Sequence, residues 1–293
     1  MKIAIFAREI SDKWKKRFFD ILKELSFRGA EMSFYAPFYY ALNENDNIEI
    51  PEGKVFTYEQ DLSPDTDFFL CFGGDGTFLE SLTIVKDKNI PVVGINFGRL
   101  GFLTSVDSVL SDDWIERLFA GNYKIEKRGV LSAMSKAIPQ GFCKYALNEV
   151  SFQRRDPFML SVHVKINGML LPPYWSDGLV LSSPTGSTAY SLSVGGPIAL
   201  PGVNALILAP IAPHNLNVRP LVVSDDSIIE VYVESRRGEA IVSLDNRSFT
   251  IPVGELVTIT MANFDLRYVS FYGDNFIGAL REKLMWGADK RNY

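Results

Sequence analysis

A buried-looking strand runs directly into a loop that has almost no side chains. Phe68 to Phe72 are five consecutive apolar residues, and Gly73-Gly74-Asp75-Gly76-Thr77 follow. Glycines allow backbone N–H groups to approach an anion closely, and a predicted helix over 77–86 adds the positive end of its dipole. A carboxylate among such amides suits a residue that holds a cation or accepts a proton from an attacking hydroxyl. The alternative is a glycine-rich turn without a ligand.

This loop does not match the two common phosphate-binding fingerprints. No Gly-Lys-Ser/Thr follows it, so it is not a Walker A motif, and its glycines lack the spacing of Gly-x-Gly-x-x-Gly. The motif alone therefore indicates a phosphate cradle without identifying the nucleotide.

A second stretch, residues 176–198, is rich in hydroxyl groups. An apolar strand leads into a Pro-Thr-Gly turn, and six hydroxyl residues then lie between Thr185 and Ser193. We expect Ser187 and Thr188 to cap a short helix that ends at Gly195-Gly196-Pro197. Tyr190 offers a flat face for a base, and the hydroxyls suit ribose and pyrophosphate. An ordinary serine-rich surface loop is the alternative.

The elements that would position these residues fall into two regions. Strands are predicted at 2–7, 32–36, 67–72 and 90–95, with helices behind Ser11-Asp12 and over 77–86 and 109–120. The run at 68–72 does not alternate, so both its faces should be buried, as in a parallel sheet. Such an α/β sheet binds ligands at the carboxyl ends of its strands.

After Gly121 the pattern changes to short strands. These are expected at 160–166, 178–182, 228–234, 240–244 and 255–261, with a hairpin turn at Asn167-Gly168. The tail returns to a strand over 267–272 and a helix with Phe276, Leu280 and Leu284 in phase. The expected fold is therefore a Rossmann-like α/β domain, 1–127, completed by the tail 267–293, and a mostly β, sandwich-like domain, 128–266.

Composition excludes several classes of protein. The chain has 293 residues, a net charge of −5 and a pI near 5.3, which argues against a nucleic-acid surface. No apolar run is long enough to span a membrane, and the first residues do not resemble a signal peptide. Two cysteines and two histidines give neither a disulfide framework nor a His-based metal cluster. We therefore expect a cytoplasmic protein with no metal site fixed by a side-chain cluster.

Several motifs, in this order, resemble those of the NAD kinase family. They are Gly73 to Thr77, residues 96–103 (NFGRLGFL), Asn148-Glu149, Asp177-Gly178 through Gly196-Pro197, Pro213-His214 and Arg219-Pro220. The Gly-Gly-Asp-Gly-Thr loop is shared with diacylglycerol- and sphingosine-type lipid kinases, whereas the segment Ser187 to Ser193 with Gly-Gly-Pro is far more particular to NAD kinases.

The resemblance implies transfer of phosphate from ATP to the 2′-hydroxyl of the adenosine ribose of NAD, with NAD held between the two domains. Asp75 matches the family's proton acceptor, and Gly73, Gly74, Gly76 and Thr77 match its phosphate loop. Residues that match NAD-binding positions are Asp75, Gly76, Asn148, Glu149, Asp177, Thr188, Ala189, Tyr190, Ser191, Leu192 and Ser193. A divalent cation, with Mg²⁺ expected, and assembly as a homodimer or homotetramer are implied in the same way.

Side-chain chemistry agrees with two of these assignments. Glu149 can accept hydrogen bonds from ribose hydroxyls, and Asn148 offers both a donor and an acceptor to an adenine edge. The pair lies between apolar neighbours, which is unusual without a function.

Two positions depart from the family's pattern. Trp175 occupies a place where the family often has Arg or Lys, and Asp245-Asn246-Arg247 replaces a frequent Asp-Gly-Gln. Trp175 could stack on the ligand or belong to the core, and Arg247 could place a charged fork near a phosphate. Both concern specificity within the site rather than the reaction.

Two other functions remain as alternatives. A lipid kinase would need an acyl cavity or a basic membrane-facing patch, and would leave the hydroxyl-rich segment without a role. A module that senses NAD without turnover would gain little from Asp75 among phosphate-binding amides.

Overall fold

A computed structural model describes residues 1–45, 53–98, 101–104, 106–107, 113–236, 238–271 and 276–285. The chain divides into two compact units, one formed by Met1–Glu126 with Arg267–Tyr293 and the other by Lys127–Leu266. Each unit has its own hydrophobic core. Residues 99–100 of the motif at 96–103 and the predicted helical residues 109–112 lie outside the described ranges.

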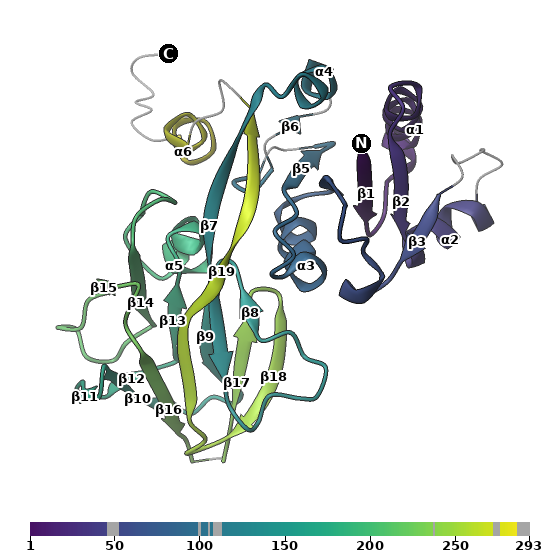
Figure 1. Ribbon diagram of the computed structural model, residues 1–293. Helices are drawn as coiled ribbons and strands as arrows, with labels where there is room; N and C mark the ends of the chain where they lie inside the picture. Colours follow the sequence, from purple (N-terminus) through teal and green to yellow (C-terminus); the bar gives the residue numbers. More distant parts are fainter. Residues whose placement is uncertain are drawn as a thin grey trace. The chain divides into compact units, whose positions relative to one another are not determined.

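The first unit is built on a parallel sheet in the order β3-β2-β1-β4-β5 (Figure 1). Its strands are β1 (Lys2–Ala7), β2 (Glu31–Tyr35), β3 (Lys54–Phe56), β4 (Phe68–Phe72) and β5 (Val92–Asn96), and the two-residue β6 (Val106–Asp107) pairs with β5. Its helices are α1 (Asp12–Phe27), α2 (Ala36–Asn45), the 3₁₀ turn η1 (Glu59–Asp61), α3 (Asp75–Val85), α4 (Asp113–Ala120) and α6 (Phe276–Leu284).

Helices cover both faces of this sheet. Alternate residues of β1 and β4, such as Ile5 and Leu70, share one core with α1, α2 and α4. The opposite face meets α3, where the ring of Phe78 lies 5.8 Å from that of Tyr268. Both faces of β4 are buried, which confirms the expectation drawn from its unbroken apolar run.

The strand order places the glycine loop at a topological switch point. β1 continues to β2 and β3 on one side, whereas β4 and β5 lie on the other. Ala7 pairs with Phe72 and Phe72 with Ile95, so these three strands end at the same edge. Open α/β sheets bind ligands at this position.

The second unit consists of two sheets. One is antiparallel in the order β15-β14-β13-β9-β17-β18, and the other contains β11-β10-β16-β19, joined by β12, β7 and β8. The six-stranded sheet contains β9 (Glu149–Arg154), β13 (Gly178–Ser182), β14 (Ala205–Ile211), β15 (Leu221–Ser224), β17 (Glu239–Leu244) and β18 (Arg247–Pro252). The other strands are β7 (Tyr123–Met134), β8 (Tyr145–Ala146), β10 (Leu160–Ile166), β11 (Met169–Leu170), β12 (Tyr174–Ser176), β16 (Ile229–Glu234) and β19 (Val257–Phe271).

These two sheets share one core, as a sandwich-like fold requires. Phe152, Leu181 and Val242 of the first sheet pack with Val162 and Val231 of the second. The hairpin turn at Asn167-Gly168 is confirmed, with φ values of 50° and 81°. The expected combination of a parallel α/β sheet with a mostly β sandwich is therefore present.

Two expectations about these elements were wrong, and one helix was not expected. The strands expected at 255–261 and 267–272 are one strand, β19, because the polar residues between them, such as Asn263 and Asp265, are accommodated without a turn. Helix α2 was not expected, since its apolar residues follow no clear helical period. Ser11 precedes α1 but its hydroxyl makes no capping hydrogen bond.

No helix within the described ranges is long and apolar enough to cross a membrane.

Candidate active site

The loop after β4 bends sharply into α3. Gly73 has φ +152°, and a Cβ on it would lie 2.5 Å from the Thr77 hydroxyl, so this position requires glycine. Gly74 and Gly76 differ, because a Cβ on either would meet no atom within 4 Å. The first amides of a helix have no acceptor one turn earlier within it, and in α3 the Thr77 and Phe78 N–H groups are donated to the Gly74 carbonyl. The open space beside Gly74 and Gly76 leaves room for an anion such as phosphate at this helix start.

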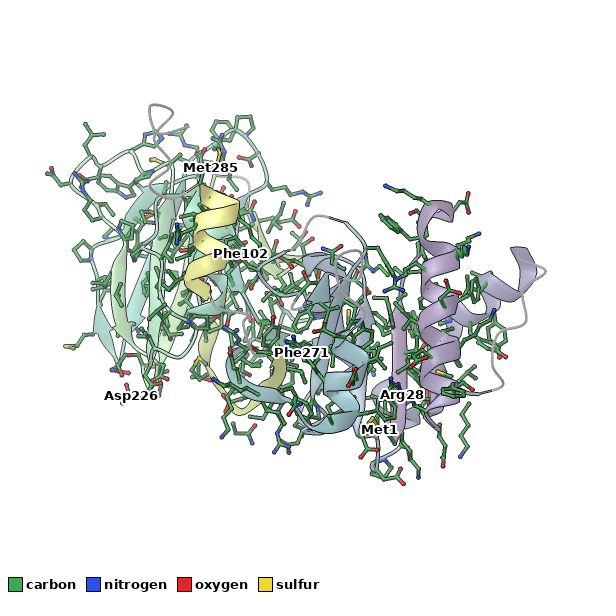
Figure 2. The ribbon with its side chains drawn as sticks, turned by 90° about the horizontal axis from the view of Figure 1, so that it is seen from above. Met1, Arg28, Phe102, Asp226, Phe271 and Met285 are labelled. Atoms are coloured by element: carbon green, nitrogen blue, oxygen red, sulfur yellow. The ribbon has the colours of Figure 1, made fainter. Side chains whose placement is uncertain are left out.

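Asp75, the first residue of α3, is fixed by the loop that follows β5. Its Oδ2 accepts the Phe102 N–H at 2.8 Å and its Oδ1 accepts the Leu103 N–H at 3.0 Å. Phe102 is labelled at the helix α6 in Figure 2. Its ring lies 6.2 Å from that of Phe276 in this helix. A carboxylate offers about four acceptor positions, so two remain for a ligand. Asp75 is therefore a half-buried acceptor held in one orientation.

Close packing around Asp75 explains a second glycine. A Cβ on Gly101 would lie 1.7 Å from Asp75 Oδ1, and the Gly101 N–H is donated to the Thr104 hydroxyl at 2.9 Å. The sequence motif around 96–103 thus supports Asp75 sterically as well as through hydrogen bonds.

In the second unit, Asn148 and Glu149 lie at the start of β9 and are buried, with 7% and 9% of their surface exposed. Asn148 Oδ1 and Glu149 Oε2 have no hydrogen-bond partner within the described residues. Buried polar atoms are nearly always paired, so unpaired atoms at adjacent residues indicate that a ligand completes them. Thr185 Oγ1 and Ser191 Oγ are unpaired in the same way.

The hydroxyl-rich segment packs directly on this strand end. It forms a 3₁₀ turn, η2 (Thr185–Thr188), and one helical turn, α5 (Tyr190–Ser193). A Cβ on Gly186 would lie 2.1 Å from the Asn148 carbonyl oxygen, so glycine allows this contact. The expectation that Ser187 and Thr188 cap a helix was wrong. Ser187 instead bridges to Ala199, donating to its carbonyl and accepting its N–H.

The electrostatics of this cluster are dominated by two buried acids. Burial first, and then the negative charge of Asp245, raise the pKa of Glu149 from 4.5 to about 8. The backbone amide of Tyr190 opposes this rise. Burial also raises the pKa of Tyr190, and the negative charges of Glu149 and Asp177 add to that rise. A Glu149 that is protonated at neutral pH can donate as well as accept.

Asp177 and Trp175 both precede the hydroxyl-rich segment in the sequence, but their environments differ. Asp177 forms an ion pair with Arg154 at 3.0 Å and is partly buried. Trp175 is 52% exposed, and its carbonyl accepts the His214 N–H. Trp175 is therefore not a core residue, and the prediction that it stacks on a ligand stands untested.

The guanidinium of Arg247 donates hydrogen bonds to main-chain carbonyls. Its Nη1 donates to Cys143 at 2.9 Å and its Nη2 to Tyr145 at 2.6 Å. The predicted contact with a phosphate remains a prediction. The neighbouring Asp245 was not among the predicted site residues, although it is central to this cluster, because an Asp-Asn pair between two strands signals only a hairpin turn.

Remaining candidates have structural environments. His163 stacks on Tyr232 with ring centres 4.5 Å apart and contacts Glu234 at 3.2 Å, which is the environment of a structural residue. Within the described ranges, no three His, Cys, Asp or Glu side chains come together as metal ligands.

One unit has a glycine cradle with a fixed carboxylate at its switch point. The other unit has buried amide, carboxyl and hydroxyl groups that are unpaired. Together these features define a nucleotide-binding phosphotransferase. The ATP-NAD kinase N-terminal domain model matches residues 16–123, and the ATP-NAD kinase C-terminal domain model matches residues 147–271. The chain belongs to the NAD kinase family.

Relatives agree over the full length of the chain. An NAD kinase of Christiangramia forsetii is 37% identical, with both chains covered completely, and one of Bacteroides fragilis is 38% identical over 99% of this chain and all of its own. Phosphorylation of NAD with ATP as donor is therefore the activity of this chain, and the comparisons give no support to a lipid kinase.

Solved structures share the fold. An Archaeoglobus fulgidus NAD kinase in complex with ATP is 28% identical, with a TM-score of 0.73 over 96% of this chain and 99% of its own. Yeast NADH kinase complexed with NADH aligns with a TM-score of 0.86 over 98% of this chain and 88% of its own, at 24% identity.

Proposed function

We propose that Asp75 is the residue that orients and deprotonates the 2′-hydroxyl of the adenosine ribose of NAD as phosphate arrives from ATP. The observation that carries this proposal is the double anchoring of its carboxylate by the Phe102 and Leu103 amides. That anchoring fixes the direction of the remaining lone pairs, and a general base works only if it is positioned.

The transfer balances with no further reactant. The 2′-oxygen forms a bond to the γ-phosphorus, the bond from that phosphorus to the β,γ-bridging oxygen breaks, and ADP leaves. The hydroxyl proton passes to Asp75 and then to solvent. We assign the amides at Gly74, Asp75 and Gly76 to the phosphates, where they would stabilise the charge of the transferred group.

NAD recognition is assigned to the second unit. The unpaired Asn148 Oδ1 suits the exocyclic amine of adenine, and Glu149 suits ribose hydroxyls in either protonation state, since those hydroxyls both donate and accept. Asp177, Trp175 and the segment Thr188 to Ser193 complete the proposed contacts.

A divalent cation, with Mg²⁺ expected, would neutralise the phosphates of ATP. Mg²⁺ binds through phosphates, water and one or two carboxylates rather than through a protein cage. Asp75 is the carboxylate of the loop that could contact it. A cytoplasmic location and assembly as dimers or tetramers belong to the same proposal and rest on resemblance to the family.

Replacing Asp75 tests this proposal. Asp75→Asn keeps the size of the side chain but removes its charge and one acceptor oxygen, so kcat for NADP formation should fall by roughly 10²–10⁴. NAD affinity, measured by calorimetry, should change much less. The acidic limb of the pH–rate profile should disappear if a base imposes it.

Asp12→Asn is a matched control, because Asp12 is also the first residue of a helix but is exposed and forms an ion pair with Lys15. Its kcat should equal that of the parent. A near-normal kcat in Asp75→Asn would reduce the loop to a phosphate cradle without a catalytic acid.

A further inference from the structure

The turn between β17 and β18 contains a carboxylate that is completely buried. Leu244 pairs with Arg247, so Asp245 and Asn246 form a two-residue hairpin turn, and Asp245 has φ +52°. The exposed fraction of the Asp245 side chain is 0%. Charged side chains are almost never fully buried without partners, and hairpin turns are usually exposed. This acid therefore has a specific role inside the unit.

Asp245 accepts three consecutive backbone amides. Its Oδ2 accepts the Leu147 N–H at 2.8 Å, and its Oδ1 accepts the Asn148 and Glu149 N–H groups at 2.8 and 3.2 Å. The Asp245 N–H is in turn donated to the Glu149 carbonyl at 3.0 Å. The turn thus holds the chain where β9 begins.

Arg247 holds the preceding residues by their carbonyl groups. Its two η nitrogens donate to the carbonyls of Cys143 and Tyr145, and its Nη2 lies 3.7 Å from Asp245. The acid therefore binds the amides of 147–149 while the base binds carbonyls of 143–145. We name Asp245 and Arg247 the turn clamp.

The remaining main-chain acceptors of this segment are also occupied. Ser183 donates its hydroxyl to the Leu147 carbonyl at 2.5 Å and its N–H to the Asn148 carbonyl at 2.9 Å. All main-chain polar groups of Leu147, Asn148 and Glu149 are thus engaged, whereas Asn148 Oδ1 and Glu149 Oε2 are unpaired. The main-chain groups of residues 147–149 are therefore all used in hydrogen bonds within the unit, whereas the unpaired side-chain oxygens of Asn148 and Glu149 can bind a ligand.

We propose that the turn clamp, Asp245 with Arg247, consists of positioning residues that fix Asn148 and Glu149 in the orientation that recognises NAD. This inference rests on the proposed role of Asn148 and Glu149. It also gives Arg247 a function that does not involve contact with a phosphate.

The charges around Glu149 support the proposal. The charge of Asp245 acts on Glu149, that of Asp177 acts on Tyr190, and Arg247 Nη2 lies 3.7 Å from Asp245. Burial raises the pKa of Asp245, while its three amide donors and Arg247 oppose that rise. Asp245 therefore has more groups that stabilise a negative charge than Glu149, on which one backbone amide acts, that of Tyr190.

Asp245→Asn tests the acid of the clamp. The amide would turn one N–H donor toward main-chain N–H groups, so the KM for NAD should rise at least about tenfold, equivalent to about 1.4 kcal/mol. The kcat at saturating NAD should change much less. Removing the charge also lowers the pKa of Glu149, so the pH dependence of KM should move to lower pH, which a purely structural role would not cause.

Arg247→Lys and Arg247→Gln test the base, and they decide the question if Asp245→Asn does not fold. One Lys nitrogen cannot serve two carbonyls as the fork does, so both variants should raise the KM for NAD to a similar extent. A direct contact with phosphate predicts instead that Lys retains a normal KM and only Gln loses it, and that result would overturn the role of Arg247.

Asp156→Asn is the control, because Asp156 is a partly exposed acid in the same unit that accepts one backbone amide, from Phe158. Its KM should equal that of the parent. Asn148→Ala and Glu149→Ala separate the two proposals. If these raise the KM for NAD while folded clamp variants keep it, the clamp is wrong. If they leave KM unchanged, the proposed NAD site itself is wrong and the clamp proposal is overturned with it.

Discussion

Glu149 shows how a single buried side chain links stability to ligand binding. Its carboxyl is shielded from water, has an unpaired oxygen and lies near the charge of Asp245. Charging it in the folded chain is unfavourable, whereas in the unfolded chain it titrates normally. The unpaired carboxyl oxygen of Glu149 is therefore available to NAD, but the folded chain is less stable at high pH because of it.

Glu149→Gln should remove that contribution to the pH dependence of stability. A carboxyl whose pKa rises from 4.5 to about 8 on folding contributes stability below pH 4.5 and loses it as pH rises toward 8. The loss is at most about 1.4 kcal/mol per pH unit, while the neutral amide loses nothing. Melting temperatures measured from pH 5 to 9 should fall more steeply for the parent than for Glu149→Gln. Parallel curves would mean that Glu149 ionises normally.

At the scale of elements, two loops at the carboxyl edge of one sheet meet at Asp75. The loop after β4 supplies the acid and the loop after β5 supplies the amides that hold it. Neither loop alone specifies the geometry. The register of β4 against β5, with Phe72 opposite Ile95, brings them together.

Two glycines three residues apart in the second loop provide a matched test. A Cβ on Gly101 would lie 1.7 Å from Asp75 Oδ1, whereas on Gly98 it would lie 3.6 Å from Asn96, an ordinary contact. Gly101→Ala should therefore displace Asp75 and lower kcat on the order of 10²-fold, as expected for a misplaced catalytic group. Gly98→Ala should remain close to the parent. Equal kcat values for both variants in the NADP assay would show that Asp75 need not be held there.

The elements also show what the sequence could and could not predict. Unbroken apolar runs predicted β4 and β13, and Asn167-Gly168 predicted its hairpin, because an apolar run and a turn dipeptide are signals contained in a few neighbouring residues. The motifs predicted Asp75, Asn148 and Glu149 as candidate site residues. Asp245 was missed because its partners lie about a hundred residues away, at 147–149, and only the pairing of β9 with β17 brings them together.

At the scale of the whole molecule, the chain forms two units whose cores close independently, yet only one unit is continuous in sequence. The core of the second unit consists of residues between Leu131 and Ile259. The core of the first unit includes Val269 and Phe271, which the chain supplies only after it has completed the second. Strand β19 therefore provides residues to both cores.

Separating the units tests this dependence. A fragment of residues 127–266 keeps its whole core and should melt cooperatively, whereas residues 1–126 alone lose Tyr268, Val269 and Phe271, each at most 6% exposed. Burying such side chains contributes about 1.5–3 kcal/mol each, and their sum is comparable to the roughly 5–15 kcal/mol that stabilises a domain. Calorimetry should therefore detect no cooperative transition in 1–126. Joining 267–293 to it through a flexible Gly/Ser linker should restore one, and cooperative melting of 1–126 by itself would show that the tail is dispensable to that core.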